Sequence, residues 1–387
     1  MKTQRLLPLA LLLVFPILMA FALQDDQGTR SKSFTVTKGG MIEVSVDGGD
    51  IRVSSWDKNE VSVRAEGIDE DNLSRLKMDQ SGNTVRVEYR NRRGWNRGHT
   101  RFEITVPTQF NTDLRTSGGD IEIRGDIDGR IKGSTSGGDV ILGNISKGTV
   151  DLSTSGGDMR TGDIQGDVNL RTSGGDIELG KVGGNADVKT SGGDIRVASV
   201  GKTLKASTSG GDITIGDVGG EATVSTSGGD VKVRRVAGWA SMSTSGGNIE
   251  LLGASGKVKA NTAGGDIRLE DITGSIEAAT AGGDVSAELE PTGTGRSRLS
   301  SAGGEITLYL PENAKATIEA IIEIEGRWGR KNREYEIKSD FKEDTYDKSG
   351  GDEDERVIRA VYKLNGGGED ITLRTVNSNI YIKKLRR

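Results

Sequence analysis

The sequence contains no cysteine and a single histidine, His99. Disulfide bonds and thiol chemistry are therefore excluded, and any histidine-dependent nucleophilic catalysis would depend on that one residue. Aromatic residues make up 4% of the chain and hydrophobic residues 33%, which is low for a globular enzyme of 387 residues. Proline occurs 5 times against 58 glycines, so the turns depend on glycine. This composition allows a thin core, one or two side chains wide.

A strongly basic face is also missing. The net charge is −5, and removal of a leader that carries Lys2 and Arg5 would bring it to about −7. Nucleic-acid binding usually needs clustered positive charge, so we expect no nucleic-acid partner.

The N-terminus has the pattern of a secretory signal peptide over residues 1–22. Lys2 and Arg5 precede the apolar run Leu6–Leu18, and Ala20-Phe21-Ala22 fits a small-x-small cleavage site. The alternative is a retained anchor, since 6–23 is mostly apolar, although Pro8 and Pro16 disfavour a spanning helix. Both readings predict an extracytoplasmic body, either periplasmic, surface-bound or secreted, with no membrane span after cleavage.

A repeated peptide, Thr-Ser-Gly-Gly-Asp, dominates the middle of the chain. Its closing residue recurs at steps of 19, 19, seven times 18, and 21 residues. A short fixed period indicates one structural unit stacked on itself. The closing residues are Asp120, Asp139, Asp158, Asp176, Asp194, Asp212, Asp230, Asn248, Asp266, Asp284 and Glu305.

Alternation within one repeat predicts its shape. Val168, Leu170 and Thr172 share one face, and after the Ser-Gly-Gly turn Ile177 and Leu179 point to the same interior, with Val182 on a short third side. The expected fold is an all-β, parallel, right-handed β-solenoid with 18-residue rungs, about 50 Å long if eleven rungs are about 4.8 Å apart. Outside the core, opposite charges one rung apart, such as Arg160, Glu178 and Arg196, are expected to pair.

Atypical β-rich regions flank the repeats. The predicted divisions are a signal peptide at 1–22, an N-terminal cap region at 23–113, the solenoid at 114–310 and a C-terminal cap with a charged loop at 311–387. In the first cap, strands are expected at 34–37, 41–46, 84–89 and 101–106, with a short helix at 69–77. In the second cap, 325–356 is dense in charge, and strands return at 369–373 and 379–383.

Several motifs resemble those of a bacterial cell-envelope β-strand-repeat family of unknown function, often labelled "putative adhesin". The motifs are Gly-Gly-Asp-Ile-Arg-Val-Ser-Ser-Trp-Asp at 48–57, Val106-Pro107, the iterated Thr-Ser-Gly-Gly-Asp-Ile, and Ile-Thr-Leu-Tyr-Leu-Pro at 306–311. The resemblance covers nearly all of 34–387. It implies a solenoid in the cell envelope and brings no established catalytic residues.

The repeated Asp and Thr columns are candidate sites with structural alternatives. Stacked carboxylates repel, and calcium would relieve that, as in nonapeptide β-rolls, although the spacing here differs. We favour Asp side chains that accept hydrogen bonds from turn amides, and expect no cofactor or metal. The Thr column is expected to face inward as a hydroxyl ladder. It comprises Thr116, Thr135, Thr154, Thr172, Thr190, Thr208, Thr226, Thr244, Thr262 and Thr280.

Two surfaces are candidates for ligand contact. One is an outward column of Ser134, Ser153, Ser207, Ser225, Ser243 and Asn261, with Arg115, Arg171 and Lys189 nearby, for which the favoured alternative is an ordinary solvated sheet face. The other is a pair of arginine-tryptophan loops, whose forked guanidinium groups suit carboxylate or phosphate and whose indoles suit a sugar or base. Their residues are Arg90, Arg92, Arg93, Trp95, Arg97 and Arg101, then Arg327, Trp328 and Arg330. The alternatives are a solvated hairpin tip, and pairing of the second loop with the acidic run 352–355.

The predicted function is a non-catalytic extracytoplasmic envelope protein with a structural, adhesive or sensing role. Its expected partner is an envelope polysaccharide or other anionic polymer, or an envelope protein. One alternative is a calcium-loaded β-roll-like module. Another is a carbohydrate-active β-helix enzyme, which would use carboxylates and need no histidine. Such sites interrupt the repeat with a unique carboxylate cluster, and the central rungs here are nearly uniform, so we expect no enzyme.

Overall fold

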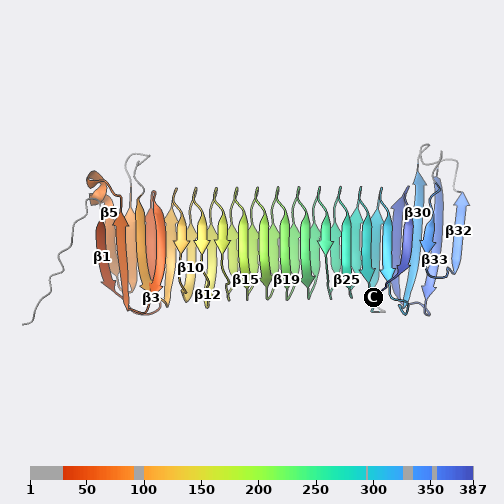
Figure 1. Cartoon of the computed structure of the whole chain (residues 1–387), viewed down its shortest axis with the longest axis horizontal. Coiled ribbons are helices and arrows are strands. Elements are labelled where there is room, and N and C mark those ends of the chain that lie inside the picture. The colour runs from red at the N-terminus through yellow and green to blue at the C-terminus, as the bar shows by residue number, and fades with distance from the viewer. Residues whose placement is uncertain (1–28, 91–99, 293–294, 326–333, 351–354, 387) are drawn as a thin grey trace, which may run out of the picture.

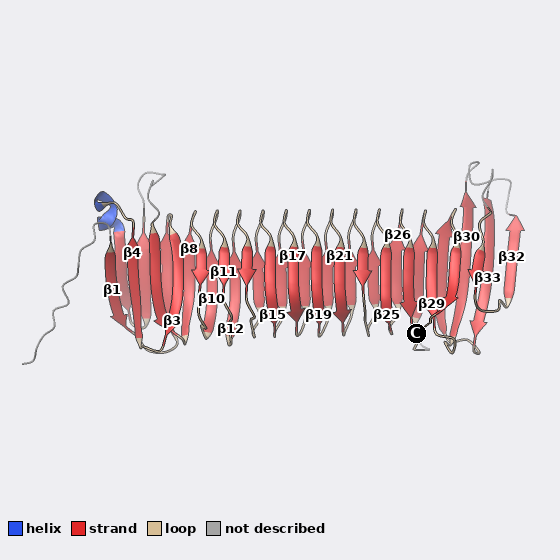
Figure 2. Cartoon of the chain, viewed as in Figure 1, coloured by secondary structure: helices blue, strands red, loops and turns tan. Residues whose placement is uncertain are grey.

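A computed structural model describes residues 29–90, 100–292, 295–325, 334–350 and 355–386. Within these ranges the chain forms an elongated rod made almost entirely of strands (Figures 1 and 2). The helix among the described residues is a single 3₁₀ element, η1 Glu70–Arg75, inside the range expected from the sequence. No helix of the described residues is both long and apolar enough to cross a membrane. The predicted signal peptide lies outside them.

The strands form two long sheets. Sheet A has 17 strands and sheet B has 18. In spatial order, sheet A consists of β1 (Arg30–Thr35), β4 (Glu60–Glu66), β7 (Arg101–Pro107), β3 (Asp50–Trp56), β9 (Ile121–Ile123), β11 (Val140–Leu142), β13 (Met159–Thr161), β15 (Ile177–Val182), β17 (Ile195–Val200), β19 (Ile213–Val218), β21 (Val231–Val236), β23 (Ile249–Leu251), β25 (Ile267–Ile272), β27 (Val285–Leu289), β29 (Ile306–Leu310), β35 (Ile380–Lys384) and β31 (Ile337–Ser339).

Sheet B lies alongside sheet A, and its strands stack along the same axis of the rod. In spatial order it consists of β5 (Leu76–Ser81), β6 (Thr84–Tyr89), β2 (Gly40–Val46), β8 (Phe110–Thr116), β10 (Gly129–Ser134), β12 (Gly148–Ser153), β14 (Val168–Arg171), β16 (Ala186–Lys189), β18 (Leu204–Ser207), β20 (Ala222–Ser225), β22 (Ala240–Ser243), β24 (Val258–Asn261), β26 (Ile276–Thr280), β28 (Arg296–Ser301), β34 (Glu369–Val376), β30 (Ala316–Glu325), β33 (Glu355–Leu364) and β32 (Thr345–Gly350).

Each central rung contributes one strand to each sheet. β14 turns Val168 and Leu170 inward, β15 turns Ile177 and Leu179 inward, and all four are 4% exposed or less. Val168 lies beside Ala186, and Ile177 beside Ile195, so neighbouring rungs stack in parallel with an offset of 18 residues. The solenoid and the register predicted from the repeat are confirmed.

The expected third side does not form a separate strand in this rung. β15 continues through Val182, and the ladder to the next rung omits Gly180. Leu179 and Val182 are three residues apart and both buried. In a regular strand, two inward residues are an even number of positions apart. The spacing of three therefore requires one extra residue in the stretch formed by Gly180 and Lys181. The third side is therefore the far end of sheet A.

The two ends of the rod depart from the order of the chain. The rung of β2 and β3 lies between the rung of β6 and β7 and the rung of β8 and β9. At the other end, β34 lies between β28 and β30, and β35 lies between β29 and β31. Antiparallel strands occur only outside these intercalated rungs in the described chain, where they finish the sheets.

Candidate functional site

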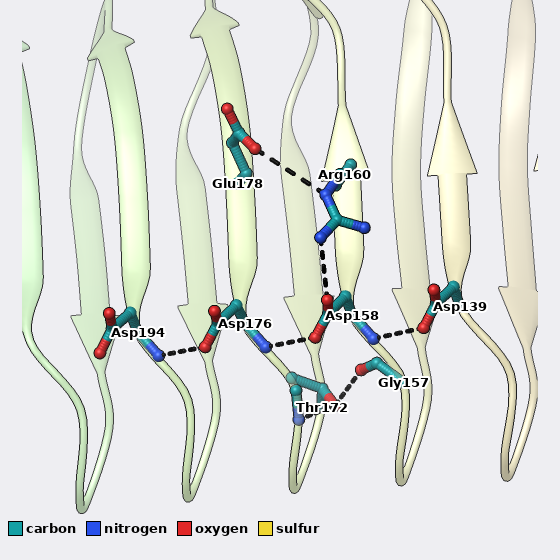
Figure 3. A network of polar contacts seen from close by, with 9 residues as sticks. Asp139, Gly157, Asp158, Arg160, Thr172, Asp176, Glu178 and Asp194 are labelled. Carbon is teal, nitrogen blue, oxygen red and sulfur yellow. Dashed lines mark hydrogen bonds and ion pairs between the residues drawn. The ribbon is translucent and has the colours of Figure 1, made fainter.

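The Asp column forms a continuous hydrogen-bonded ladder along one edge of the rod (Figure 3). The backbone N–H of Asp176 donates to Oδ1 of Asp158 at 2.9 Å, and that of Asp194 donates to Oδ1 of Asp176 at 2.8 Å. The same bond runs through Asn248, whose Oδ1 accepts from the N–H of Asp266 at 2.8 Å. The carboxylates therefore accept bonds from turn amides, as we favoured.

This ladder bears on the calcium alternative. One oxygen of each bonded carboxylate is already used by an amide of the next rung. Among the residues that the structure describes, no group of three or more His, Asp or Glu side chains is placed to hold a metal ion. The side-chain amide of Asn248 accepts the same hydrogen bond as the carboxylates do, so a negative charge is not needed to accept it.

The Thr column faces inward and joins consecutive turns. Thr172 Oγ1 donates to the carbonyl of Gly157 at 2.9 Å and accepts from the N–H of Gly175 at 3.4 Å. Every threonine of the column is 7% exposed or less. The internal hydroxyl ladder predicted from alternation is confirmed, and the column presents no hydroxyl array to solvent.

The outer charges of sheet A pair differently from the prediction. Arg160 does reach Glu178 of the next rung, at 4.0 Å, but it lies closer to Asp158 of its own rung, at 2.9 Å (Figure 3). Arg196 pairs with Asp194 at 2.8 Å. A carboxylate two residues away on the same strand lies on the same face, so it competes with the neighbouring rung for the guanidinium.

The outward polar column of sheet B is longer than expected. The three basic residues placed near it belong to it, because strand register aligns Ser153 with Arg171 and Lys189 with Ser207. We call this column the polar face. From one end to the other it consists of Arg115, Ser134, Ser153, Arg171, Lys189, Ser207, Ser225, Ser243, Asn261, Ala279, Ser300 and Arg374.

The charged members of the polar face are partly engaged. Arg115 pairs with Asp113 at 2.8 Å, and Arg171 lies 3.4 Å from Asp187 of the next rung. Both guanidinium groups are about half exposed, so water screens these pairs and each contributes little. Between them the face is made of small hydroxyl side chains. A long extended ligand would find a hydroxyl, amide or cationic donor at every rung of this face except that of Ala279.

The two described arginines of the first loop have unlike surroundings. Arg90, which follows β6, pairs with Asp47 at 2.9 Å with its side chain 62% exposed. Arg101 begins β7, and its Nε is buried without a hydrogen-bond partner among the described residues. Arg90 belongs to a surface and Arg101 to a strand. Arg92, Arg93, Trp95 and Arg97 lie outside the described residues, as do Arg327, Trp328 and Arg330.

One buried carboxylate was missed by sequence reasoning. Glu369, the first residue of β34, is 2% exposed and accepts a hydrogen bond from Ser297 Oγ at 2.6 Å. Burial raises the pKa of Glu369, and the bond from Ser297 opposes that only in part. The signal was present in the alternation of 369–373, which puts Glu369 on the same face as Ile371 and Leu373.

These features define a class: a parallel β-solenoid of two facing sheets, closed at each turn by a threonine and an aspartate ladder. The chain belongs to the Toastrack family DUF4097, whose profile matches residues 40–233 and 202–324. A search of curated proteins finds no match.

Three solved structures of bacterial proteins are among those to which this chain is similar. A protein described as a "putative adhesin" from Parabacteroides distasonis is 14% identical, with 68% of this chain and 98% of that chain covered and a TM-score of 0.33. A "putative adhesin" from Bacteroides fragilis is 13% identical, covering 93% and 98%, with a TM-score of 0.22. A "Putative lipid binding protein" from Parabacteroides distasonis is 12% identical, covering 93% and 97%, with a TM-score of 0.22.

Proposed function

We propose that this protein is a non-catalytic extracytoplasmic component of the bacterial envelope. Its role is structural, adhesive or sensing, and it binds an envelope polysaccharide or other anionic polymer along the polar face. The predicted signal peptide supports the location. Family membership is consistent with this setting and assigns no reaction.

The observation that carries the proposal is the continuity of the polar face. Register aligns one outward residue from each of twelve strands, from Arg115 to Arg374, without a large apolar side chain among them. Adjacent strands of a sheet are about 4.8 Å apart, so these outward residues form an evenly spaced row. Each contact is weak alone, but many contacts to one polymer add through effective concentration.

The arginine loop at 90–101 is the second part of the proposal. Arg90 places one exposed guanidinium beside the end of sheet B, and its ion pair with Asp47 is exposed enough to exchange for a ligand carboxylate. Arg101 is left out of the binding set, because its Nε is buried within β7.

The test is co-sedimentation of the chain 23–387 with purified insoluble envelope polymers. A polar-face variant, Arg171→Ala with Lys189→Ala, should lose most of the binding. The matched control, Arg196→Ala with Lys232→Ala, removes two positive charges from the outward side of sheet A and should bind like the parent. A loop variant, in which Arg90, Arg92, Arg93 and Arg97 are changed to alanine, tests the second part separately.

Three outcomes would count against the proposal. Absence of binding by the parent would leave a purely structural role or a protein partner. Equal losses of binding in the polar-face variant and its sheet A control would show that binding depends on net charge and not on the polar face. Release of soluble sugars from the polymer would overturn the non-catalytic assignment.

A further inference from the structure

A groove of about 640 Å³ lies on the outer side of sheet B near the C-terminal end of the rod. It crosses β26, β28, β34, β30 and β33, where the regular repeats meet the intercalated rung. Its volume falls in the range of about 300–1,000 Å³ that small-molecule sites occupy. The sequence reasoning found no site here, because no repeat motif marks it.

One guanidinium in this groove has no partner among the residues that the structure describes. Arg298 of β28 lies between Glu277 of β26 and Thr372 of β34. Glu277 is engaged on its other side by Lys257 and Lys259. Arg298 has no ion pair or hydrogen bond with any residue that the structure describes.

Both lysines lie close to the Glu277 carboxylate and favour its ionised form. Lys257 Nζ lies 3.2 Å and Lys259 Nζ lies 3.4 Å from the Glu277 carboxylate. The hydrogen bond from Lys257, with the charge of Lys259, holds the pKa of Glu277 below its ordinary value. The carboxylate that strand register places beside Arg298 is thus ionised and already shared by two cations.

The next carboxylates along the groove are also engaged. Glu319 of β30 pairs with Arg359 at 3.2 Å. Asp370 of β34 lies 3.9 Å from Arg296, whose side chain is 90% exposed. That distance and exposure make the contact weak, so Arg296 is free to turn towards a bound anion. Arg296 and Arg298 are two residues apart on one strand and therefore project from the same face.

The floor of the groove is held by buried hydrogen bonds. Ser297, between the two arginines, is 2% exposed; its Oγ accepts from the N–H of Ile276 at 3.0 Å and donates to Glu369 at 2.6 Å. These bonds join β26, β28 and β34 directly beneath the arginine pair. Val361, Thr317 and Thr372 add apolar or methyl-bearing surface to the lining.

We propose that this groove binds the carboxylate of an acidic saccharide, with Arg298 as the principal ligand-binding residue and Arg296 closing over the same group. The forked guanidinium matches a planar carboxylate in two parallel hydrogen bonds. The small side chains beside it accommodate the face of a sugar ring. The groove shares only its class of ligand with the proposed function; it involves neither the polar face nor the arginine loops.

The probe is trigalacturonate, with fully methyl-esterified trigalacturonate as its uncharged counterpart, titrated calorimetrically into the chain 23–387 at low ionic strength. We expect binding of the acid and none of the ester. Arg298→Ala should weaken the affinity at least about tenfold, as expected when a charge-assisted bidentate contact is lost. Glu277→Gln releases two lysines towards the ligand and should strengthen binding about threefold.

The matched control is Arg196→Ala, an exposed guanidinium on the outward side of sheet A, outside both the groove and the polar face, which should change the affinity less than about twofold. The three substituted residues are on the surface of strands, so thermal melting of each variant should match the parent. Equal binding of acid and ester, unchanged affinity in Arg298→Ala, or no binding of the acid would each overturn the groove assignment. Retained co-sedimentation with envelope polymers in Arg298→Ala would leave the proposed function intact, which separates the two tests.

Discussion

The middle and the ends of this rod are built by different rules. In the middle, each rung pairs with the rungs just before and just after it in the chain, as β15 does with β13 and β17. At each end, a rung distant in sequence is inserted between two others: β2 and β3 at one end, β34 and β35 at the other. The repeat determines how neighbouring rungs stack but not where the stack ends. The inserted rungs end it.

The comparison also locates the unusual chemistry. Central rungs join their turns through nearly identical Thr and Asp ladders, in which Asn248 takes the place of one aspartate. The buried carboxylate Glu369 and Arg298, which has no partner in the described part of the chain, both occur where β34 enters the stack. Both residues therefore lie where the regular repeat ends.

The test with the largest expected effect compares two deletions, one of an intercalated rung and one of a central rung. A chain ending after Gly368 loses β34 and β35, which bury Ile371, Leu373, Ile380 and Ile382 between their neighbours. The strands on either side of β34 and β35 would then have unpaired edges, and no other strand that the structure describes near the C-terminal end is available to pair with them. We expect a midpoint of thermal unfolding at least about 15 °C lower, or aggregation, measured by circular dichroism and light scattering.

The matched excision of residues 177–194 also removes one rung, and it joins Asp176 to Ile195 in the same register. Because nearest-neighbour contacts are restored, we expect one cooperative transition within about 5 °C of the parent. Equal losses in the two deletions would show that the intercalated rung has no special closing role.

The second prediction compares the two glycines of one turn. A Cβ at Gly138 would overlap the backbone carbonyl of Gly119, whereas a Cβ at Gly137 would lie 3.6 Å from its nearest neighbour, in ordinary contact. Gly138→Ala should therefore cost about 1–3 kcal/mol of unfolding free energy, as overpacking does. Gly137→Ala should change it by less than about 0.5 kcal/mol. Denaturant unfolding of both variants checks this, and equal costs would contradict the stacking geometry.

Much of the middle was predictable because its period and alternation act together. A repeat of 18 residues sets which residues align, and alternation sets which of them face inward, so the burial of Ile177 and Thr172 followed from sequence. The pairing of Arg196 did not, because carboxylates on its own strand and on neighbouring rungs are chemically equal candidates.

The order of the ends was not predictable in the same way. Strands were correctly expected at 41–46, 84–89, 101–106 and 369–373, but alternation identifies a buried face and not a neighbour. Neither β2 nor β34 carries a repeat motif that indicates which strands it pairs with. The Arg298 groove depends on that unpredicted order, since it needs β34 to separate β28 from β30.

The third prediction separates hydrogen bonding from charge in the Asp ladder. The Oδ1 of Asp212 accepts from the N–H of Asp230 at 2.8 Å. Asp212→Ala removes that acceptor and should cost about 0.5–1.5 kcal/mol. Asp212→Asn keeps an acceptor, as Asn248 does naturally, and should be close to neutral. A large cost for the asparagine variant, or a calcium-dependent rise in the melting midpoint of the parent, would instead indicate a charged or metal-linked role.

The last prediction concerns Glu369 at the C-terminal end. Burial raises its pKa in the folded state above the value in the unfolded chain, so between those two values the folded state binds more protons. Stability from this group is therefore fully present below the unfolded pKa and is lost as pH rises through the folded pKa. Glu369→Gln keeps an acceptor for Ser297 and removes the buried charge, so the variant should melt slightly higher than the parent at pH 7 and equally at pH 4. Melting curves across this range check the sign, and a Glu369→Gln variant that is less stable at pH 7 would mean that the ionised carboxylate has a stabilising partner.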